Sequence, residues 1–250
     1  MAPVLDLFTL VVAAIGWLTY KVLTLPRCKA RVKYLQTATN MISMDTPPGV
    51  AGSCHVFTGP MFSSKTSRLL SELTTYFDVT GNKPLLIGHC WDSRAPGSVA
   101  SSHSSQFTTS NHLDSLKSNT LMDLDVSAYT VIGIDEAQFF PDLPEFVFRC
   151  LDQGKHMYVA GLDGTFEQKT FGRIHELLPR SEEFIKLNAI CSRCLELAPR
   201  PIRPNQLSSA PFTMRMQAST ELVVIGGADM YMAVCRNHLP RTLSDAAKLD

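Results

Sequence analysis

The 250-residue sequence has no surplus of charge of either sign, because 23 Lys and Arg residues balance 23 Asp and Glu residues. Without a basic surplus there is no general attraction to phosphate backbones, which argues against a nucleic-acid partner. Cysteine is also sparse: the 7 cysteines lack the dense spacing of a secreted disulfide scaffold. Apolar residues make up 45% of the chain, which predicts a packed core and excludes a disordered chain.

Long uncharged runs are rare, and the one that stands out lies near the N-terminus, at residues 7–20 between Asp6 and Lys21. A membrane-spanning helix needs about 20 apolar residues, which residues 7–25 approach only if Lys21 extends to the interface. A basic cluster follows, the reverse of a cleaved signal peptide, and it would keep the rest of the chain on the cytoplasmic side. Residues 1–33 therefore form either a membrane anchor or an ordinary buried or dispensable helix.

Residues 34–53 contain a Pro- and Gly-containing stretch, typical of a linker, and the globular part begins near Cys54. Short apolar runs predict strands at 54–58, 84–88, 129–135 and 157–163. A helical stripe follows the first strand, and another helix is predicted at 143–154. Strands alternating with helices predict an α/β fold with a mostly parallel sheet covered on both faces.

The segment "GPMFSSKT" nearly matches the phosphate-binding loop pattern G-x-x-x-x-G-K-[ST], with Ser64 in place of the second glycine. In such a loop Lys65 reaches phosphates and the Thr66 hydroxyl helps to hold Mg²⁺. If Ser64 must adopt a left-handed conformation, the strain costs about 1–2 kcal/mol. An ordinary strand-to-helix turn would also explain the pattern. The predicted nucleotide-binding residues of this loop are Gly59, Pro60, Met61, Phe62, Ser63, Ser64, Lys65 and Thr66.

Two adjacent acids, Asp135 and Glu136, end the apolar strand predicted at 129–135. Ligands of open α/β sheets bind at the carboxyl ends of strands. Asp135 could therefore hold Mg²⁺, and Glu136 could accept a proton from an attacking hydroxyl. The alternative is a solvated strand end or a helix cap.

Cysteine and histidine pairs late in the chain have metal-ligand spacing: C-x₂-C at Cys191 and Cys194, then C-x₂-H at Cys235 and His238. Four such ligands can close a tetrahedral structural Zn²⁺ site. Reduced thiols are needed for this, which favours a cytosolic environment. The alternative is that Cys191 and Cys194 are simple buried thiols. The other cysteines have no such pairing.

Four segments in order, "GPMFSSKT", "IGIDEAQFFPD", "LDGTFEQKTFG" and "IGGADMY", resemble those of the cellular and poxvirus-type thymidine kinase family. The resemblance covers roughly residues 54–238. It implies a RecA-like P-loop kinase core at 54–190, a small zinc and lasso subdomain at 191–238, and a tail at 239–250. The implied reaction is ATP-dependent phosphorylation of the thymidine 5′-hydroxyl to dTMP, a pyrimidine salvage step for DNA synthesis.

The resemblance also implies roles for individual residues. Glu136 would be the general base, and Asp135, Lys65 and Thr66 would serve phosphate and Mg²⁺. Asp92 and Arg94 match the family's D-x-R element, with Arg94 near the phosphates. A lasso loop would bind the base through backbone around Thr213, Val224 and Gly226. The walls of the nucleoside pocket would be Met61, Phe139, Leu162, Phe166, Phe171 and Tyr231, for each of which core packing is the default alternative.

Two departures from the family pattern bear on efficiency more than on reaction type. One is Ser64, and the other is "PRPIRPNQLSS", which looks like an insertion that bulges outward. Two alternatives stay open: a deoxynucleoside kinase of broader base choice, and a catalytically weakened or silent nucleotide-binding relative. The resemblance further implies thymidine or deoxyuridine as substrate, and a homotetramer inhibited by the end-product triphosphate.

Overall fold

The computed structural model describes residues 51–91, 112–216 and 229–239, all within one compact unit that begins at Pro47. The predicted anchor at 1–33, nearly all of the linker, Asp92, Arg94, Val224, Gly226 and nearly all of the tail therefore lie outside the described residues. Within the described ranges, no helix has the length and apolar character needed to cross a membrane.

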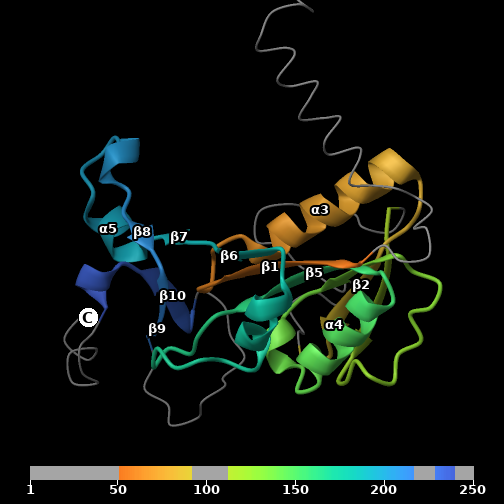
Figure 1. The fold of residues 1–250 in the computed structure, drawn as a ribbon. Helices are drawn as coiled ribbons and strands as arrows, with labels where there is room; N and C mark the ends of the chain where they lie inside the picture. Colours follow the sequence, from red (N-terminus) through yellow and green to blue (C-terminus); the bar gives the residue numbers. More distant parts are fainter. Residues whose placement is uncertain (1–50, 92–111, 217–228, 240–250) are drawn as a thin grey trace, which may run out of the picture. The chain divides into compact units, whose positions relative to one another are not determined.

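A parallel sheet forms the centre of the described fold and confirms the predicted α/β class (Figure 1). Its six strands in the described residues are β1 (Ser53–Gly59), β2 (Leu85–His89), β3 (Asp114–Ser118), β4 (Val131–Ile134), β5 (His156–Leu162) and β6 (Glu183–Lys186). They lie in the order β3-β2-β4-β5-β1-β6, and each neighbouring pair is parallel. All six carboxyl ends therefore meet at one edge, where α/β proteins bind ligands.

Helices cover both faces of the sheet, because successive side chains of a strand point to opposite sides (Figure 1). On one face, α3 (Lys65–Thr80) buries Leu69, Leu70 and Leu73 against a layer that includes Phe57. On the other, α4 (Leu143–Asp152) packs its apolar side against a layer that includes Val56. Neighbouring residues of β1 thus belong to different layers, and both faces are buried as a parallel sheet requires.

A small subdomain follows the sheet. It contains β7 (Ala189–Ile190), α5 (Ser192–Leu197), β8 (Ser209–Ala210), β9 (Phe212–Arg215) and β10 (Tyr231–Val234). Strands β7 and β8 form one antiparallel pair, and β9 and β10 another. The proline-rich segment between α5 and β8 is exposed over most of its length, as expected of an insertion that turns outward because it has little to bury.

Candidate active site

The phosphate-binding loop connects β1 to α3 and is held in an unusual backbone conformation. Gly59 has φ 141°, and a Cβ there would lie 2.2 Å from the carbonyl oxygen of Leu187. Phe62 and Ser64 both have positive φ, 64° and 61°. Ser64 therefore occupies the left-handed conformation that glycine adopts without strain. The sequence indicated strain at Ser64 if the residue adopts this conformation, and the observed φ shows that it does.

Lys65 bends back over the loop that precedes it. Its Nζ donates a hydrogen bond to the carbonyl oxygen of Pro60 at 2.6 Å and lies 3.4 Å from Ser63 Oγ. Ser63 Oγ in turn donates to the Pro60 carbonyl at 2.8 Å. The ammonium of Lys65, the one positive charge of the loop, thus lies against the loop backbone, where it can attract an anionic phosphate group.

Thr66 joins the loop to the acidic end of β4. Its hydroxyl donates to Asp135 Oδ1 at 3.1 Å, although β5 lies between β1 and β4 in the sheet. Asp135 is almost completely buried, at 3% exposure. A hydroxyl and a carboxylate brought together in this way are the hard oxygen donors that Mg²⁺ prefers. The residues present therefore fit a Mg²⁺ bound with nucleotide phosphates.

Glu136 directly follows Asp135 and has a left-handed backbone, with φ 53°. It precedes the short helix η2 (Ala137–Phe139), but its side chain makes no capping hydrogen bond to that helix. Instead, Glu136 Oε2 accepts a 2.7 Å bond from Gln138 Nε2. Glu136 thus occupies the N-cap position of η2 without a side-chain capping bond, and its half-buried carboxylate lies at the carboxyl-end edge of the sheet.

The expected nucleoside-wall residues fall into two groups in the described structure. In the first, the rings of Phe139 and Phe171 lie edge to face with centroids 5.6 Å apart. In the second, Phe166 and Tyr231 both contact Arg215. Met61 connects the loop to the subdomain, because its N–H donates to Thr213 Oγ1 of β9 at 3.0 Å. Leu162 is the last residue of β5, half-buried beside Gln138.

Arg215 was not assigned a role from the sequence, although it lies two residues after Thr213, which was expected to contribute backbone to the base-binding loop. Its guanidinium lies 4.1 Å from the centroid of the Phe166 ring, and its Nη2 donates to the Tyr231 hydroxyl at 2.9 Å. Arg215 and Tyr231 also stand directly opposite each other in the β9–β10 pair. One buried cation therefore joins two expected wall residues from different segments.

His89 and Trp91 extend the first group and were also missed. The rings of both lie within 5.6 Å of Phe139, and His89 Nδ1 accepts the Trp91 N–H at 3.1 Å. Burial lowers the pKa of His89 below its ordinary value, and the carboxylate of Glu136 acts in the opposite direction. With Nδ1 an acceptor, the proton of the neutral ring resides on Nε2.

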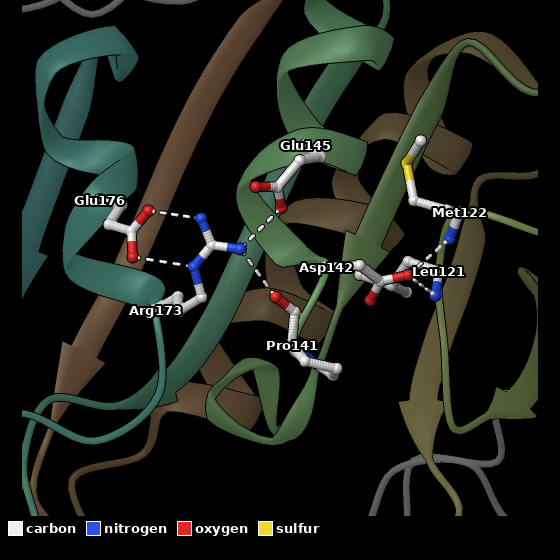
Figure 2. A network of polar contacts seen from close by, with 7 residues as sticks. All are labelled: Leu121, Met122, Pro141, Asp142, Glu145, Arg173 and Glu176. Atoms are coloured by element: carbon white, nitrogen blue, oxygen red, sulfur yellow. Dashed lines mark hydrogen bonds and ion pairs between the residues drawn. The ribbon is translucent and has the colours of Figure 1, made fainter.

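Arg173 anchors the end of the loop that carries Phe166 and Phe171 (Figure 2). It donates to both carboxylate oxygens of Glu176, to Glu145 and to the Pro141 carbonyl, at 2.7–2.9 Å. Next to it, the Asp142 carboxylate accepts two backbone N–H groups, those of Leu121 and Met122, at 2.8 Å each (Figure 2). The Arg173 contacts connect the segment that follows Phe139 with the end of the loop that carries Phe171. They therefore hold in place the backbone next to both rings of the Phe139–Phe171 pair.

The four predicted metal ligands are brought together in the small subdomain. Their donor atoms lie within 4.8 Å of one another, and His238 Nδ1 is 3.3–3.5 Å from the three sulfur atoms. Cys194 and Cys235 sulfurs are 3.8 Å apart. A tetrahedral Zn²⁺ with bonds of about 2.0–2.3 Å holds its donors about 3.5–3.8 Å apart. The cluster therefore fits a closed zinc site.

The Cys191 thiol has the electrostatics of a metal ligand. Burial opposes its ionisation, but hydrogen bonds from the backbone of Cys194 and Cys235 and from the His238 side chain lower the pKa to about 7. The thiolate is the form that binds a metal. This disfavours the alternative of simple buried thiols, in contrast to Cys54, whose burial and proximity to Glu182 raise the pKa to about 12.

A P-loop with its lysine and threonine next to a strand-end acid, on a parallel α/β sheet, defines a nucleotide-binding site of the phosphotransferase class. The sequence model of one such family, described as Thymidine kinase, matches residues 52–239. The chain belongs to the thymidine kinase family.

Relatives named thymidine kinase match about three quarters of the chain. The cytosolic thymidine kinases of Cricetulus griseus and Bos taurus are each 38% identical to it over 195 residues, which is 76% of this chain and 74% and 73% of the relatives. The thymidine kinase of Variola virus is 36% identical over 187 residues, 74% of this chain and 95% of the relative. The resemblance to both cellular and poxvirus enzymes is confirmed.

Proposed function

We propose that the chain transfers the γ-phosphate of ATP to the 5′-hydroxyl of thymidine, and of deoxyuridine, to give the 5′-monophosphate. Family membership and the names of the relatives support this reaction. The observation that carries it is the Thr66–Asp135 hydrogen bond of 3.1 Å, which brings the phosphate-binding loop to the acids that end β4.

Each residue at this edge has a part in the proposed reaction. Lys65 turns from the Pro60 carbonyl to the nucleotide phosphates, since its ammonium already lies over the loop. Thr66 and Asp135 would hold Mg²⁺, which when bound neutralises phosphate charge. Glu136 accepts the proton of the 5′-hydroxyl as the hydroxyl oxygen attacks the γ-phosphorus. Phosphoryl transfer asks mainly for such positioning and charge neutralisation.

The remaining partners follow from the family resemblance. A structural Zn²⁺ on Cys191, Cys194, Cys235 and His238 would hold β10 and the end of β7 together. A homotetramer is proposed on the resemblance alone. The relatives from Cricetulus griseus and Bos taurus are named cytosolic, which supports a cytoplasmic catalytic domain. Of the alternatives, a silent relative is not favoured, because Lys65, Thr66, Asp135 and Glu136 are all retained at one edge.

Glu136→Gln tests this function. The change keeps the size of the side chain but removes the proton acceptor, so kcat for thymidine should fall about 100- to 10,000-fold. ATP and thymidine dissociation constants should stay within about 3-fold, since binding does not need the base. Steady-state kinetics and calorimetry measure both.

A matched control is Glu183→Gln, which makes the same change at the first residue of β6, toward the amino edge of the sheet. It should keep wild-type turnover. Equal turnover of wild type and Glu136→Gln would show that Glu136 is not the base. Absence of any thymidine phosphorylation by the wild-type chain with Mg-ATP would overturn the function itself.

A further inference from the structure

Gln138 connects two parts of the candidate site through the two ends of its side-chain amide. Its Nε2 donates to Glu136 Oε2 at 2.7 Å, and its Oε1 accepts the backbone N–H of Leu162 at 2.9 Å. One residue thus ties the carboxylate that follows β4 to the last residue of β5. The two strands are neighbours in the sheet.

The orientation of this amide is fixed by its neighbours. The backbone N–H of Leu162 can only donate, and an ionised Glu136 carboxylate can only accept, so the amide oxygen must face Leu162 and the nitrogen must face Glu136. Gln138 is 3% exposed, so water does not compete for either bond. Both bonds are therefore satisfied in one orientation and would be lost by turning the amide over.

Two glycines make room for Gln138. A Cβ on Gly161 would lie 2.8 Å from Gln138 Oε1. A Cβ on Gly172, which has φ 61°, would lie 2.2 Å from the Gln138 carbonyl oxygen. Gly161 is in β5, and Gly172 directly follows Phe171. Gly161 thus packs against the side chain of Gln138, and Gly172 packs against its backbone. Such close packing restricts the position of Gln138, as expected for a residue that orients a reacting group.

We propose that Gln138 is a positioning residue for the transfer reaction: it holds the Glu136 carboxylate in the orientation that receives the proton of the nucleoside 5′-hydroxyl. The proton passes to Glu136 while the hydroxyl oxygen bonds to the γ-phosphorus and the bond from that phosphorus to the β–γ bridging oxygen breaks, which leaves ADP. This inference rests on the proposed role of Glu136 as the base. Glu136 itself has a left-handed backbone, and the 2.7 Å bond from Gln138 Nε2 to its Oε2 is the contact that orients the carboxylate in this proposal.

The test uses Gln138→Glu in the full-length chain. The variant keeps an oxygen for the Leu162 N–H, but it replaces the donor that faces Glu136 by a second acceptor. We expect kcat for thymidine to fall about 10- to 100-fold, since a small misplacement of a reacting group costs this much. KM for thymidine and the ATP dissociation constant should stay within about 3-fold.

A double-mutant cycle separates positioning from a general structural effect. In the Glu136→Gln background the base is already absent, so adding Gln138→Glu should lower the residual kcat by less than about 2-fold. Gln153→Glu makes the same chemical change at the exposed C-cap of α4 and should leave kcat unchanged. If Gln138→Glu does not fold, Gly161→Ala places a Cβ 2.8 Å from Gln138 Oε1, and also 3.0 Å from the flexible end of Ile174, without changing Gln138 itself. The same loss of kcat with unchanged ATP affinity is then expected.

Three results would decide against the proposal. Wild-type kcat in Gln138→Glu overturns it while leaving the proposed function intact, provided that Glu136→Gln is inactive. An equal loss in both backgrounds overturns it as well, because Gln138 would then act independently of Glu136. Wild-type kcat in Glu136→Gln overturns the base assignment, and the positioning role falls with it.

Discussion

Ser64 stands at the start of α3 with φ 61° and ψ 27°, and its side chain is exposed and makes no capping hydrogen bond. In a non-glycine residue, this conformation costs the folded state about 1–2 kcal/mol. Replacing the residue by glycine removes that strain, but it lowers stability by about 0.4–1 kcal/mol because the unfolded chain gains conformational freedom. We therefore expect Ser64→Gly to raise the free energy of unfolding by about 0.5–1 kcal/mol, or Tm by about 1–4 °C. ATP affinity should rise, because the loop relaxes into its binding conformation.

Ser64→Ala is the matched control for this change. It removes the hydroxyl but keeps the Cβ, so the strain remains and neither Tm nor ATP affinity should rise. Thermal melting and ATP titration of both variants separate the two contributions. A fall in ATP affinity in both variants would mean that the loop uses the serine hydroxyl.

Single residues whose role follows from a local pattern could be predicted from the sequence. Lys65, Thr66, Asp135 and Glu136 were identified by their places after apolar strands, and the structure brings them to one edge. Gln138 and Arg215 could not be predicted, because each has partners distant in the sequence. Gln138 bonds to Leu162 as well as to nearby Glu136, and Arg215 contacts Phe166 and Tyr231. A buried polar side chain gives no periodic signal, and its partner is set by tertiary packing.

Among the strands of the central sheet, those with a continuous run of apolar residues could be predicted from the sequence. The four predicted strands correspond to β1, β2, β4 and β5, which lie next to one another in the middle of the sheet. The two strands of this sheet that were not predicted, β3 and β6, are its edges. Edge strands are short and partly solvated, so "DSLKS" and "EFIK" lack the continuous apolar run of a buried parallel strand.

The β9–β10 pair supports a prediction about Arg215. Arg215→Lys keeps the charge, but lysine cannot both stack its head group flat on the Phe166 ring and donate in a fixed direction to the Tyr231 hydroxyl. We expect KM for thymidine to rise about 5- to 20-fold, since two expected wall residues lose their common support. KM for ATP should change less than about 2-fold, because Arg215 acts on Phe166 and Tyr231, which are expected to line the nucleoside pocket, whereas Lys65 and Thr66 belong to the phosphate-binding loop.

Arg180→Lys provides the comparison for this variant. Arg180 also lies over an aromatic ring, 4.6 Å from the Phe148 centroid, and it pairs with Asp152 at the end of α4. That end leads into the first residues of β5, opposite the ligand-binding edge, so steady-state kinetics should show no change. An unaltered thymidine KM in Arg215→Lys would show that Arg215 serves folding alone.

At the scale of the whole molecule, the order of the strands in the sheet brings together two motifs that are far apart in the sequence. The phosphate-binding loop and the acidic pair are about 70 residues apart in sequence, and they meet only because β4, β5 and β1 are consecutive in the sheet. Sequence patterns predicted β1, β4, β5 and both motifs. Because ligands of open α/β sheets bind at the carboxyl ends of the strands, the sequence also predicted that the two motifs lie at the same edge of the sheet. The order of the strands, and hence the Thr66–Asp135 contact, required the structure.

The metal cluster is connected to the phosphate-binding loop through the same packing. Phe62 of the loop packs against the buried cluster that contains Cys191, Met214 and Val234, and the Met61 N–H donates to Thr213 Oγ1. Loss of the metal should therefore loosen the subdomain and change the loop as well. This predicts a combined effect on stability and on the binding of both substrates.

Cys191→Ser tests this connection, because it removes the most buried of the four ligands. Zinc content measured by atomic absorption should fall well below about one equivalent per chain. Tm should fall by about 10 °C or more, since a closed structural zinc site contributes folding free energy directly, and KM should rise for ATP and thymidine together. Cys90→Ser changes an exposed thiol outside the cluster and should keep its zinc. Full zinc content in Cys191→Ser would disprove the site, whereas loss of zinc with unchanged KM for both substrates would show that Phe62 and Met61 do not transmit its effect.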